Sequence, residues 1–332
     1  MVQSDLVPPV SAPHAAVEFG FYLPQVKLGF DELRARVQLA EQLGYDTMWF
    51  YDHLYSPGAP DVPAFEGWTL VAALAAVTTR IRLGHLVLCN AFRHPAVFAK
   101  QLFTLDAISN GRIELGIGTG SYPQEFAEYG LPFPSYRERA AQLDEALQVI
   151  KLLATEPRSS FTGRYYTLQD APGALRPVQR PWPRITIGGG GEKFTLPLVA
   201  RHADMWNCPT YSLAEFQHKL GVLRRECERI GRDPATLRIS EEGMLVVAPD
   251  GPTLRAAEEA ARRRYGTPGW GLEAGGYIGT PERLVEHILG KVNQGITHFA
   301  LFFHDRGTPE SLELFATRVI AEVRRATAGA AS

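Results

Sequence analysis

Residues 17–27, which read VEFGFYLPQVK, decide between the two folds that this chain can adopt. Val17–Leu23 is a largely apolar run that is typical of a buried β-strand. A doubly wound dinucleotide-binding sheet would continue directly into a Gly-x-Gly-x-x-Gly turn, with an acidic residue about twenty positions later. The chain continues instead with Pro24-Gln25-Val26-Lys27, so this segment favours a barrel.

Beyond this segment, short apolar runs alternate with longer amphipathic segments almost to the end of the chain. Strands are expected at residues 17–23, 47–51, 81–88, 112–118, 184–187, 204–208, 237–247 and 298–303. Helices are expected at residues 31–43, 68–77, 95–107, 136–153, 213–230, 253–264, 281–293 and 310–325. This order predicts an α/β fold of the (β/α)₈ TIM-barrel type.

Two segments interrupt the alternation. Residues 155–183 are rich in proline and contain a hairpin-like stretch at 161–166, and residues 265–279 are rich in glycine around Trp270. We therefore expect insertions after strands four and seven, the second of them a mobile lid. Residues 17–326 are expected to form one domain, and residues 1–16 a flexible tail.

Composition excludes several classes of function. The 332 residues carry a formal net charge of −2, which argues against a nucleic-acid-binding surface. The three cysteines, Cys89, Cys208 and Cys227, are too few and too scattered for a disulfide framework or a zinc site. No apolar run approaches the length of a membrane helix. We expect a cytoplasmic protein that acts on a small molecule and binds no metal, nucleic acid or membrane.

The sequence ITIGGGGEK, residues 185–193, is the strongest candidate site, because a strand ends there in Gly188, Gly189, Gly190 and Gly191 before a helix. Four consecutive glycines carry a large entropic cost in an ordinary turn. Bare amides at a helix N-terminus bind anions, and Lys193 adds positive charge. We predict a phosphate site, with a surface loop as the alternative.

Three further candidates lie where strands end, which is the functional face of a barrel. Asp52 and His53 follow the second strand, and histidine can move a proton or stabilise negative charge, although a structural histidine is the alternative. Thr119 and Gly120 belong to a Gly-x-Gly-x-Gly stretch that tight packing explains equally well. Cys89 lies near Arg93 and His94, which could cap a helix, form ion pairs or contact substrate; nothing marks Cys89 as a nucleophile.

Several motifs occur together and in order along residues 17–305. They are WFYDH at 49–53, RIRLG at 80–84, FRHPAV at 92–97, SNGR at 109–112 running to Gly120, YGLPF at 129–133, IGGGGE at 187–192 and ADMWN at 203–207. In these motifs the chain resembles the luciferase-like monooxygenases, and most closely their deazaflavin-dependent subgroup.

The resemblance implies a flavin-like ring over the strand ends and a phosphate at Gly188–Gly191. It also implies a non-proline cis peptide bond at Leu86–Val87. It assigns Leu86, Val87, Cys89, Thr119 and Gly120 to the cofactor, and it places His53, with Asp52, near the redox-active carbon. Glu125 is expected to supply an acid nearby.

Two departures from the subgroup limit the substrate. Its sugar-phosphate dehydrogenases carry glutamate and tryptophan where this chain has Ser121 and Pro57, so a glucose-phosphate-like substrate is not expected. The predicted function is hydride transfer between a deazaflavin, coenzyme F420, and a small organic substrate. The alternatives are an FMN-dependent monooxygenase and a non-catalytic barrel.

The resemblance also implies a homodimer, for which the small side chains of residues 72–77 are suited, although packing on the chain's own barrel explains them as well. The substrate pocket is expected to involve Tyr22, Tyr55, Phe65, Tyr122 and the 265–279 loop.

Overall fold

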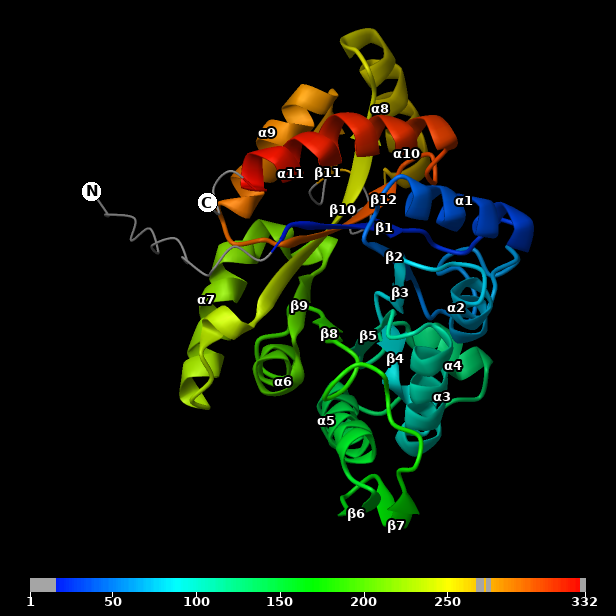
Figure 1. The fold of residues 1–332 in the computed structure, drawn as a ribbon, viewed down its shortest axis with the longest axis vertical. Coiled ribbons are helices and arrows are strands. Elements are labelled where there is room, and N and C mark those ends of the chain that lie inside the picture. Colours follow the sequence, from blue (N-terminus) through cyan, green and yellow to red (C-terminus); the bar gives the residue numbers. More distant parts are fainter. Residues whose placement is uncertain (1–15, 267–271, 273–275, 329–332) are drawn as a thin grey trace.

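The computed structural model describes residues 16–266, 272 and 276–328. Eight parallel strands form a barrel (Figure 1). The barrel is closed because the seventh strand pairs with the sixth and the eighth, and the eighth pairs with the first. These strands are β1 (Glu18–Tyr22), β2 (Thr47–Phe50), β3 (Arg82–His85), β5 (Ile113–Gly118), β8 (Ile185–Gly188), β9 (Met205–Cys208), β10 (Arg238–Val247) and β12 (His298–Phe303). The predicted TIM barrel is confirmed.

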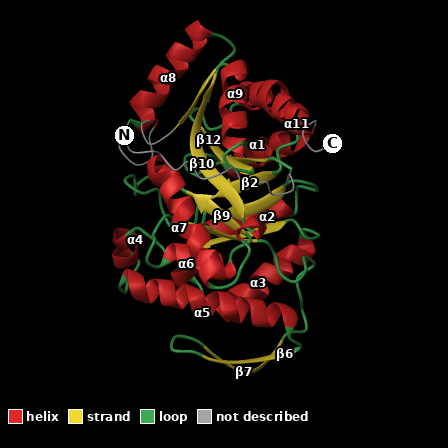
Figure 2. Ribbon diagram, turned by 90° about the vertical axis from the view of Figure 1, so that its left-hand side faces the viewer, coloured by secondary structure: helices red, strands yellow, loops and turns green. Residues whose placement is uncertain are grey.

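Amphipathic helices cover the outside of the barrel (Figure 2). They are α1 (Phe30–Gln42), α2 (Gly67–Ala75), α3 (Pro95–Ile108), α5 (Tyr136–Thr155), α6 (Thr195–His202), α7 (Phe216–Arg229), α8 (Gly251–Tyr265), α9 (Pro281–Val292), α10 (Pro309–Phe315) and α11 (Ala321–Ala328), the last two joined by a π turn at Ala316–Ile320. Local signals set their ends: Ser135 and Glu138 form a capping box at the start of α5. Each helix then buries its apolar side on the sheet, as α1 does with Leu33 and Val37.

The expected insertions are present, and they contain more strand than predicted. The first insertion forms an antiparallel hairpin, β6 (Arg158–Thr162) and β7 (Thr167–Pro172), which lies outside α5 (Figure 2). The second contains a strand, β11 (Gly276–Gly279), that was expected to be loop. It forms because β10 continues beyond its contact with β9, so residues 244–247 of β10 are free to pair with β11.

The predicted third strand is also divided. It is broken after His85 by a cis peptide bond at Leu86–Val87, and pairing with β5 resumes in β4 (Leu88–Cys89). A short helix, α4 (Pro123–Glu128), was not predicted. The expected tail, residues 1–16, lies outside the described residues except for Ala16, and Trp270 of the expected lid also lies outside them.

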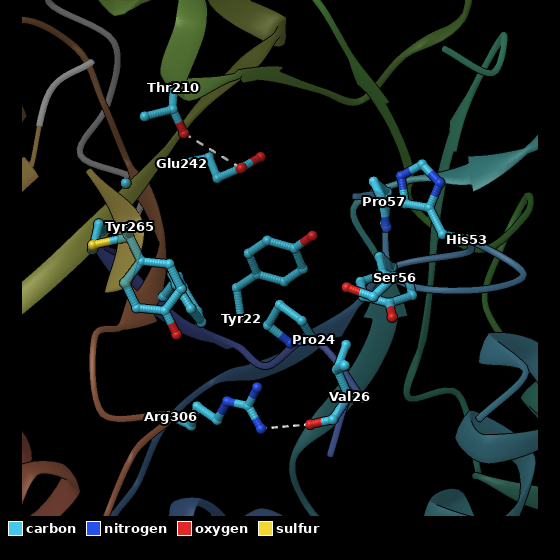
Figure 3. Close-up of a pocket in the computed structure, with 14 residues that line it drawn as sticks. Tyr22, Pro24, Val26, His53, Ser56, Pro57, Thr210, Glu242, Tyr265 and Arg306 are labelled. Atoms are coloured by element: carbon cyan, nitrogen blue, oxygen red, sulfur yellow. Dashed lines mark hydrogen bonds between the residues drawn. The ribbon is translucent and has the colours of Figure 1, made fainter. Parts of the chain in front are cut away.

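Alternate residues of each strand face the barrel interior and fill it in layers. At the C-terminal ends of the strands the interior opens into a cavity (Figure 3). Below it the fully buried Trp49 occupies the centre. A Cβ atom on Gly20 would lie 2.5 Å from the indole, and one on Gly84 would lie 2.7 Å from it. These glycines are required because the indole takes the space of their side chains.

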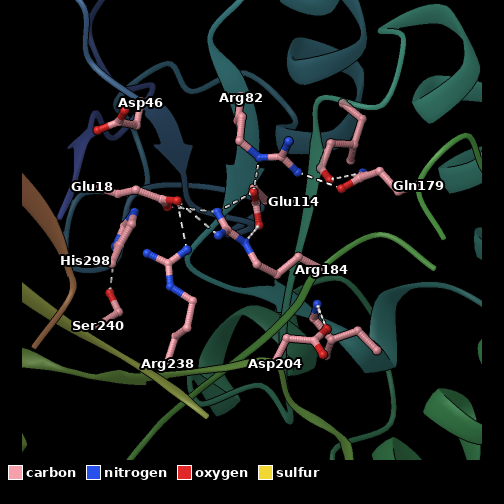
Figure 4. Close-up of polar contacts among 12 residues, drawn as sticks. Glu18, Asp46, Arg82, Glu114, Gln179, Arg184, Asp204, Arg238, Ser240 and His298 are labelled. Carbon is pink, nitrogen blue, oxygen red and sulfur yellow. Dashed lines mark hydrogen bonds and ion pairs between the residues drawn. The ribbon is translucent and has the colours of Figure 1, made fainter. Parts of the chain in front are cut away.

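The floor of the barrel, at the N-terminal ends of the strands, is closed by charged side chains (Figure 4). Glu114 is fully buried and contacts Arg82 as well as Arg184, the latter at 2.6 Å. Arg184 also binds Glu18 at 3.0 Å, and Arg238 binds Glu18 at 2.8 Å. Each charge therefore has an opposite partner, which is the condition for keeping buried groups ionised.

This floor predicts how stability depends on pH. Burial would raise the pKa of Glu18, but Arg184 and Arg238 outweigh it and lower the pKa to about 2. A lowered folded-state pKa stabilises the fold above the unfolded value of 4.5, and the contribution is lost as the pH falls toward 2. We expect Glu18→Gln to reduce the free energy of unfolding by about 2–3 kcal/mol at neutral pH in urea denaturation, and by progressively less in acid.

The control for this experiment is Glu259→Gln. The Glu259 side chain is 73% exposed, and its contact with Arg263 is 3.7 Å long. An exposed pair of this kind contributes little, so the control should change stability by less than about 0.5 kcal/mol at any pH. Equal effects of the two substitutions would contradict a stabilising role for the floor.

Candidate active site

A cavity of about 220 Å³ opens where the barrel strands end. Its walls are mostly aromatic and apolar, and a small number of polar groups reach it (Figure 3). The apolar part includes Tyr22, Val26, Tyr51, Met244, Tyr265 and Phe302, and the polar part His53, Thr210, Glu242 and Arg306. An apolar pocket with few convergent polar groups is typical of a small-molecule site.

His53 reaches this cavity from the loop after β2 and is held from behind by Glu125 of α4. The His53 Nδ1 lies 2.9 Å from the Glu125 Oε1, and the Leu54 amide donates to the other carboxylate oxygen at 2.9 Å. Glu125 is only 2% exposed and is not among the residues that line the cavity. Its carboxylate therefore orients the imidazole, with Nδ1–H donated to Glu125 and Nε2 left for a ligand.

Asp52, the other candidate in this loop, faces away from the cavity. Its carboxylate accepts hydrogen bonds from the Arg93 Nη1 and Nη2, at 2.7 and 2.8 Å, and from the Cys89 amide at 2.8 Å. Arg93 also contacts Glu66. Of the roles left open for Arg93 and His94, the structure shows ion pairing for Arg93, whereas the His94 ring accepts from Ala96 N at 3.3 Å and caps α3. Asp52 thus anchors β4 to the β2 loop.

The cis peptide bond implied at Leu86–Val87 is present. Leu86 packs with Tyr22 and Tyr51 beneath the cavity, and Val87 packs against the same group. A Cβ atom on Gly118 would lie 2.7 Å from the Val87 side chain, and one on Gly188 3.1 Å from it. The Leu86–Val87 segment therefore lies between the cavity and the start of the glycine stretch.

The four glycines follow β8 and lead to α6, as predicted. Hydroxyl groups crowd this loop: a Cβ atom on Gly190 would lie 2.3 Å from the Ser212 Oγ, and one on Gly191 2.5 Å from the Tyr136 hydroxyl. Within the described part of the chain, neither the Gly190 nor the Gly191 amide donates a hydrogen bond. Free amides and hydroxyls at the start of a helix are suitable donors for a phosphate.

A second lysine beside this loop, Lys219, was not predicted. Lys193 lies with its Nζ 5.5 Å from the Phe194 ring centre. Lys219 also reaches the glycines: its Cε would be 3.7 Å from a Cβ atom on Gly190, and its Nζ binds Glu192 at 2.7 Å. Lys219 comes from α7, far along the chain, so sequence spacing gave no signal for it.

The remaining cofactor candidates lie on the rim between these regions. Gly120 has φ of +81°, and a Cβ atom there would lie 2.8 Å from the Cys89 Sγ. Burial raises the pKa of the Cys89 thiol to about 12, so it acts here as a small packing group. Thr119 is half-buried beside Gly120. Of the residues expected in the pocket, Tyr22 lines the cavity, whereas Tyr55, Phe65 and Tyr122 do not belong to its lining.

Glu242 is a buried acidic lining residue that sequence reasoning missed. It lies within β10, where Glu241 and Glu242 face opposite sides of the sheet; Glu241 binds Lys291 at 2.9 Å outside, and Glu242 faces the cavity. Burial raises the pKa of Glu242 to about 7. The available signal was an acidic pair inside a strand that is otherwise buried.

Neither a metal-binding cluster nor a membrane-spanning helix is present among the described residues. No group of three or more histidine, cysteine, aspartate or glutamate residues there is arranged to hold a metal ion. None of the described helices has the length and apolar character needed to cross a bilayer.

Comparison with known proteins adds the family. The sequence profile described as luciferase-like monooxygenase matches residues 17–270. The F420-dependent glucose-6-phosphate dehydrogenase of Intrasporangium calvum is 38% identical over 192 residues, which cover 56% of this chain and 55% of that protein. The F420-dependent hydroxymycolic acid dehydrogenase of Mycobacterium tuberculosis is 31% identical over 240 residues, which cover 72% and 65%. The chain thus spans less than two thirds of the length of these relatives.

Solved structures show the same architecture. The coenzyme F420 dependent tetrahydromethanopterin reductase from Methanopyrus kandleri superposes with a TM-score of 0.76 at 21% identity, and the match covers 93% of this chain and 100% of that one. At this identity the likeness concerns the fold. The family profile, in contrast, covers most of the chain and includes both the His53 loop and the glycine stretch. The chain belongs to the luciferase-like monooxygenase family.

Proposed function

We propose that the chain is a coenzyme F420-dependent oxidoreductase that transfers a hydride between the deazaflavin and a small organic substrate. The observation that carries this proposal is the cradle at Gly190 and Gly191. A Cβ atom there would collide with the Ser212 and Tyr136 hydroxyls, and the two amides donate no hydrogen bond to any residue that the structure describes. The names of the relatives in Intrasporangium calvum and Mycobacterium tuberculosis support a deazaflavin.

Two regions of this chain would bind different parts of the coenzyme. The Gly188–Gly191 loop, with Lys219 beside it, would hold the phosphate, and the Leu86–Val87 segment would support the ring. A deazaflavin has carbon in place of the reactive ring nitrogen of a flavin, so it supplies or accepts electron pairs as hydride. A doubly protonated His53, with its Nδ1–H donated to Glu125, would direct its Nε2–H at the reduced ring and stabilise the negative charge there.

A sugar phosphate is not the substrate that this cavity favours. Among the described lining residues Arg306 is the only permanent cation, and its Nη1 already donates to the Val26 carbonyl oxygen at 2.6 Å. The other walls are largely aromatic and apolar. We therefore propose a substrate other than glucose 6-phosphate, in agreement with the sequence departures at Pro57 and Ser121.

We also propose that residues 17–326 act as one cytoplasmic domain and that two chains associate. The apolar Val77, which follows α2, is 38% exposed, and Val97 and Ile108 on α3 are 60% and 61% exposed. Exposed apolar side chains on neighbouring helices support an interface between copies of the chain.

The first test of the function is titration of the purified protein with coenzyme F420 and, separately, with FMN. We expect a dissociation constant in the range of about 1–10 μM for the deazaflavin, measured by its fluorescence, and much weaker binding of FMN. Micromolar binding of FMN without binding of coenzyme F420 would instead support the FMN-dependent monooxygenase. Binding of neither would support a non-catalytic barrel.

The second prediction concerns the glycine cradle. In Gly190→Ala the new Cβ atom would lie 2.3 Å from the Ser212 Oγ, so the loop must shift. Coenzyme affinity should therefore fall by at least about tenfold. The matched control is Gly290→Ala in α9, where a Cβ atom meets nothing within 4 Å. That control should leave affinity unchanged and slightly stabilise the helix. Equal affinities of the two variants would argue against the cradle as the phosphate site.

The third prediction separates the two oxidation states of the coenzyme. His53→Ala should weaken binding of the reduced coenzyme by about tenfold, because a hydrogen bond to a charged group is lost, and should hardly change binding of the oxidised form. Anaerobic fluorescence titration measures both affinities. His94→Ala, which removes a helix cap outside the cavity lining, is the control and should affect neither. A parallel loss in both oxidation states would contradict the role given to His53.

A further inference from the structure

We propose that Glu242 is a neutral acid that donates a hydrogen bond, and then a proton, to the oxygen of an uncharged carbonyl substrate in the cavity. In the opposite direction, its carboxylate takes the proton of the corresponding alcohol. This inference rests on the proposed function, because hydride transfer to the carbonyl carbon is what makes that oxygen basic. It adds a second polar group to the site, on a different wall from His53 (Figure 3).

A directed chain of hydrogen bonds through the barrel interior decides which oxygen of Glu242 carries the proton. The Trp49 indole N–H donates to the His298 Nε2 at 3.3 Å, so the opposite ring nitrogen, Nδ1, carries hydrogen and donates to the Ser240 Oγ at 2.9 Å. Burial lowers the pKa of His298 to about 3, which keeps this ring neutral. The direction of donation at the start of the chain is thus set by the indole, which can only donate.

This series of hydrogen bonds continues from Ser240 to Glu242. The Ser240 hydroxyl donates to the Asn207 Oδ1 at 3.0 Å, and the Asn207 amide then donates to the Glu242 Oε2 at 3.3 Å. Oε2 is therefore an acceptor, and the proton belongs on Oε1. The Thr210 hydroxyl donates to Oε1 at 3.4 Å, at the edge of the cavity, so the hydrogen on Oε1 is left for a ligand.

The other buried carboxyl groups of the described residues have much stronger partners. Asp52, Glu114 and Glu241 each bind at least one arginine or lysine. Asp106 and Glu125 each accept a backbone amide, at 2.7 and 2.9 Å respectively. Glu242 has two uncharged side-chain contacts of 3.3 and 3.4 Å. A buried carboxyl with so little compensation favours the neutral form.

The groups around Glu242 do not supply a compensating positive charge. The ionisable side chains that face it or share the cavity with it are Tyr22, Tyr51, His53, Cys208, Tyr211, Tyr265 and Arg306. Burial raises the pKa values of Tyr22 and Cys208, and the next cause is Glu242 for Tyr22 and Glu241 for Cys208, so both groups are neutral. Arg306 lies across the cavity from Glu242, where its Nη1 donates to the Val26 carbonyl oxygen (Figure 3). The pKa of about 7 caused by burial of Glu242 places the change between acid and carboxylate in the working range of an enzyme.

The proton and electron balance of the step is complete. When a hydride reaches the carbonyl carbon, the π bond to oxygen breaks and its electron pair stays on the oxygen. The Oε1–H bond of Glu242 then breaks and the proton joins that oxygen, which leaves an alcohol and a carboxylate. The two reducing electrons arrive with the hydride from a reduced deazaflavin, and the oxidised coenzyme is the other product. Solvent returns a proton to Glu242 before the next turnover.

The substrate class follows from the same walls. An anionic substrate would meet apolar side chains and a carboxyl group that ionises near neutral pH, which is unfavourable in a poorly solvated cavity. An uncharged ketone, aldehyde or alcohol with an apolar body meets a hydrogen-bond donor in Glu242 and aromatic surface in Tyr22, Tyr51 and Phe302. We therefore assign the site to uncharged carbonyl compounds and their alcohols.

The first experiment needs neither coenzyme nor substrate. A protonated carboxyl group has an infrared C=O band that a carboxylate lacks, and we expect the protein at about pH 6 to show such a band, shifted in D₂O and absent in Glu242→Gln. Glu241→Gln is the matched control, because the neighbouring Glu241 carboxylate binds Lys291 at 2.9 Å and should not contribute to the band. The same band in wild type and Glu242→Gln would overturn the proposal.

The second experiment measures binding of two ketones to the coenzyme-loaded protein by saturation-transfer NMR. Cyclohexanone and 4-oxocyclohexanecarboxylate share a ring and a carbonyl group, but the second is an anion. We expect the wild type to bind cyclohexanone about tenfold more tightly at about pH 6 than at about pH 8, and the anion more weakly at both. In Glu242→Gln the amide does not titrate, so affinity for cyclohexanone should be independent of pH. Tighter binding of the anion, or the same pH dependence in both proteins, would overturn the proposal.

The two proposals fail in different ways. If the protein shows the carboxylic-acid band but binds no deazaflavin, the proposed function is refuted, and with it the proton transfer. A chain that binds the deazaflavin without the band refutes the assignment of Glu242 alone.

Discussion

Side chains of a closed parallel barrel alternate between its surface and its interior, and the interior has room for a small number of them at each level. In this chain the lowest level is the charged floor around Glu114, and the middle level is filled by Trp49. The indole fits at the centre because Gly20 and Gly84 have no side chains. The cavity exists because these two levels close the barrel beneath it.

The same packing connects the core to the site. Trp49 fills space, and its N–H begins the chain of hydrogen bonds that passes through His298 and Asn207 to Glu242. Each buried polar group in this series of hydrogen bonds needs a partner, and each partner orients the next. His53 is positioned differently, by a buried carboxylate from outside the barrel. The cavity thus receives one polar group oriented from the core and one oriented from a loop helix.

The division of β10 between two neighbours explains why Glu242 is available. Its first residues pair with β9 and its last ones with β11, and Glu242 lies at the point where the strand leaves β9. Its carboxyl group therefore faces the cavity with side-chain contacts to Asn207 and Thr210. The extra strand after the seventh barrel strand thereby shapes the wall of the site.

Local patterns were sufficient for the barrel, for the placement of the four glycines between β8 and α6, and for the position of Asp52 and His53 after β2, because periodicity and strand ends are properties of contiguous residues. They were insufficient for Lys219 and Glu242, which come from α7 and β10. They also did not show that Asp52 turns away to Arg93 while His53 faces the cavity. The sequence by itself determined the order of strands and the location of the loops that carry function. Tertiary structure decided which side chains meet there and which carboxyl group lacks a cation, because burial and pairing depend on residues that are distant along the chain and adjacent only after the barrel closes.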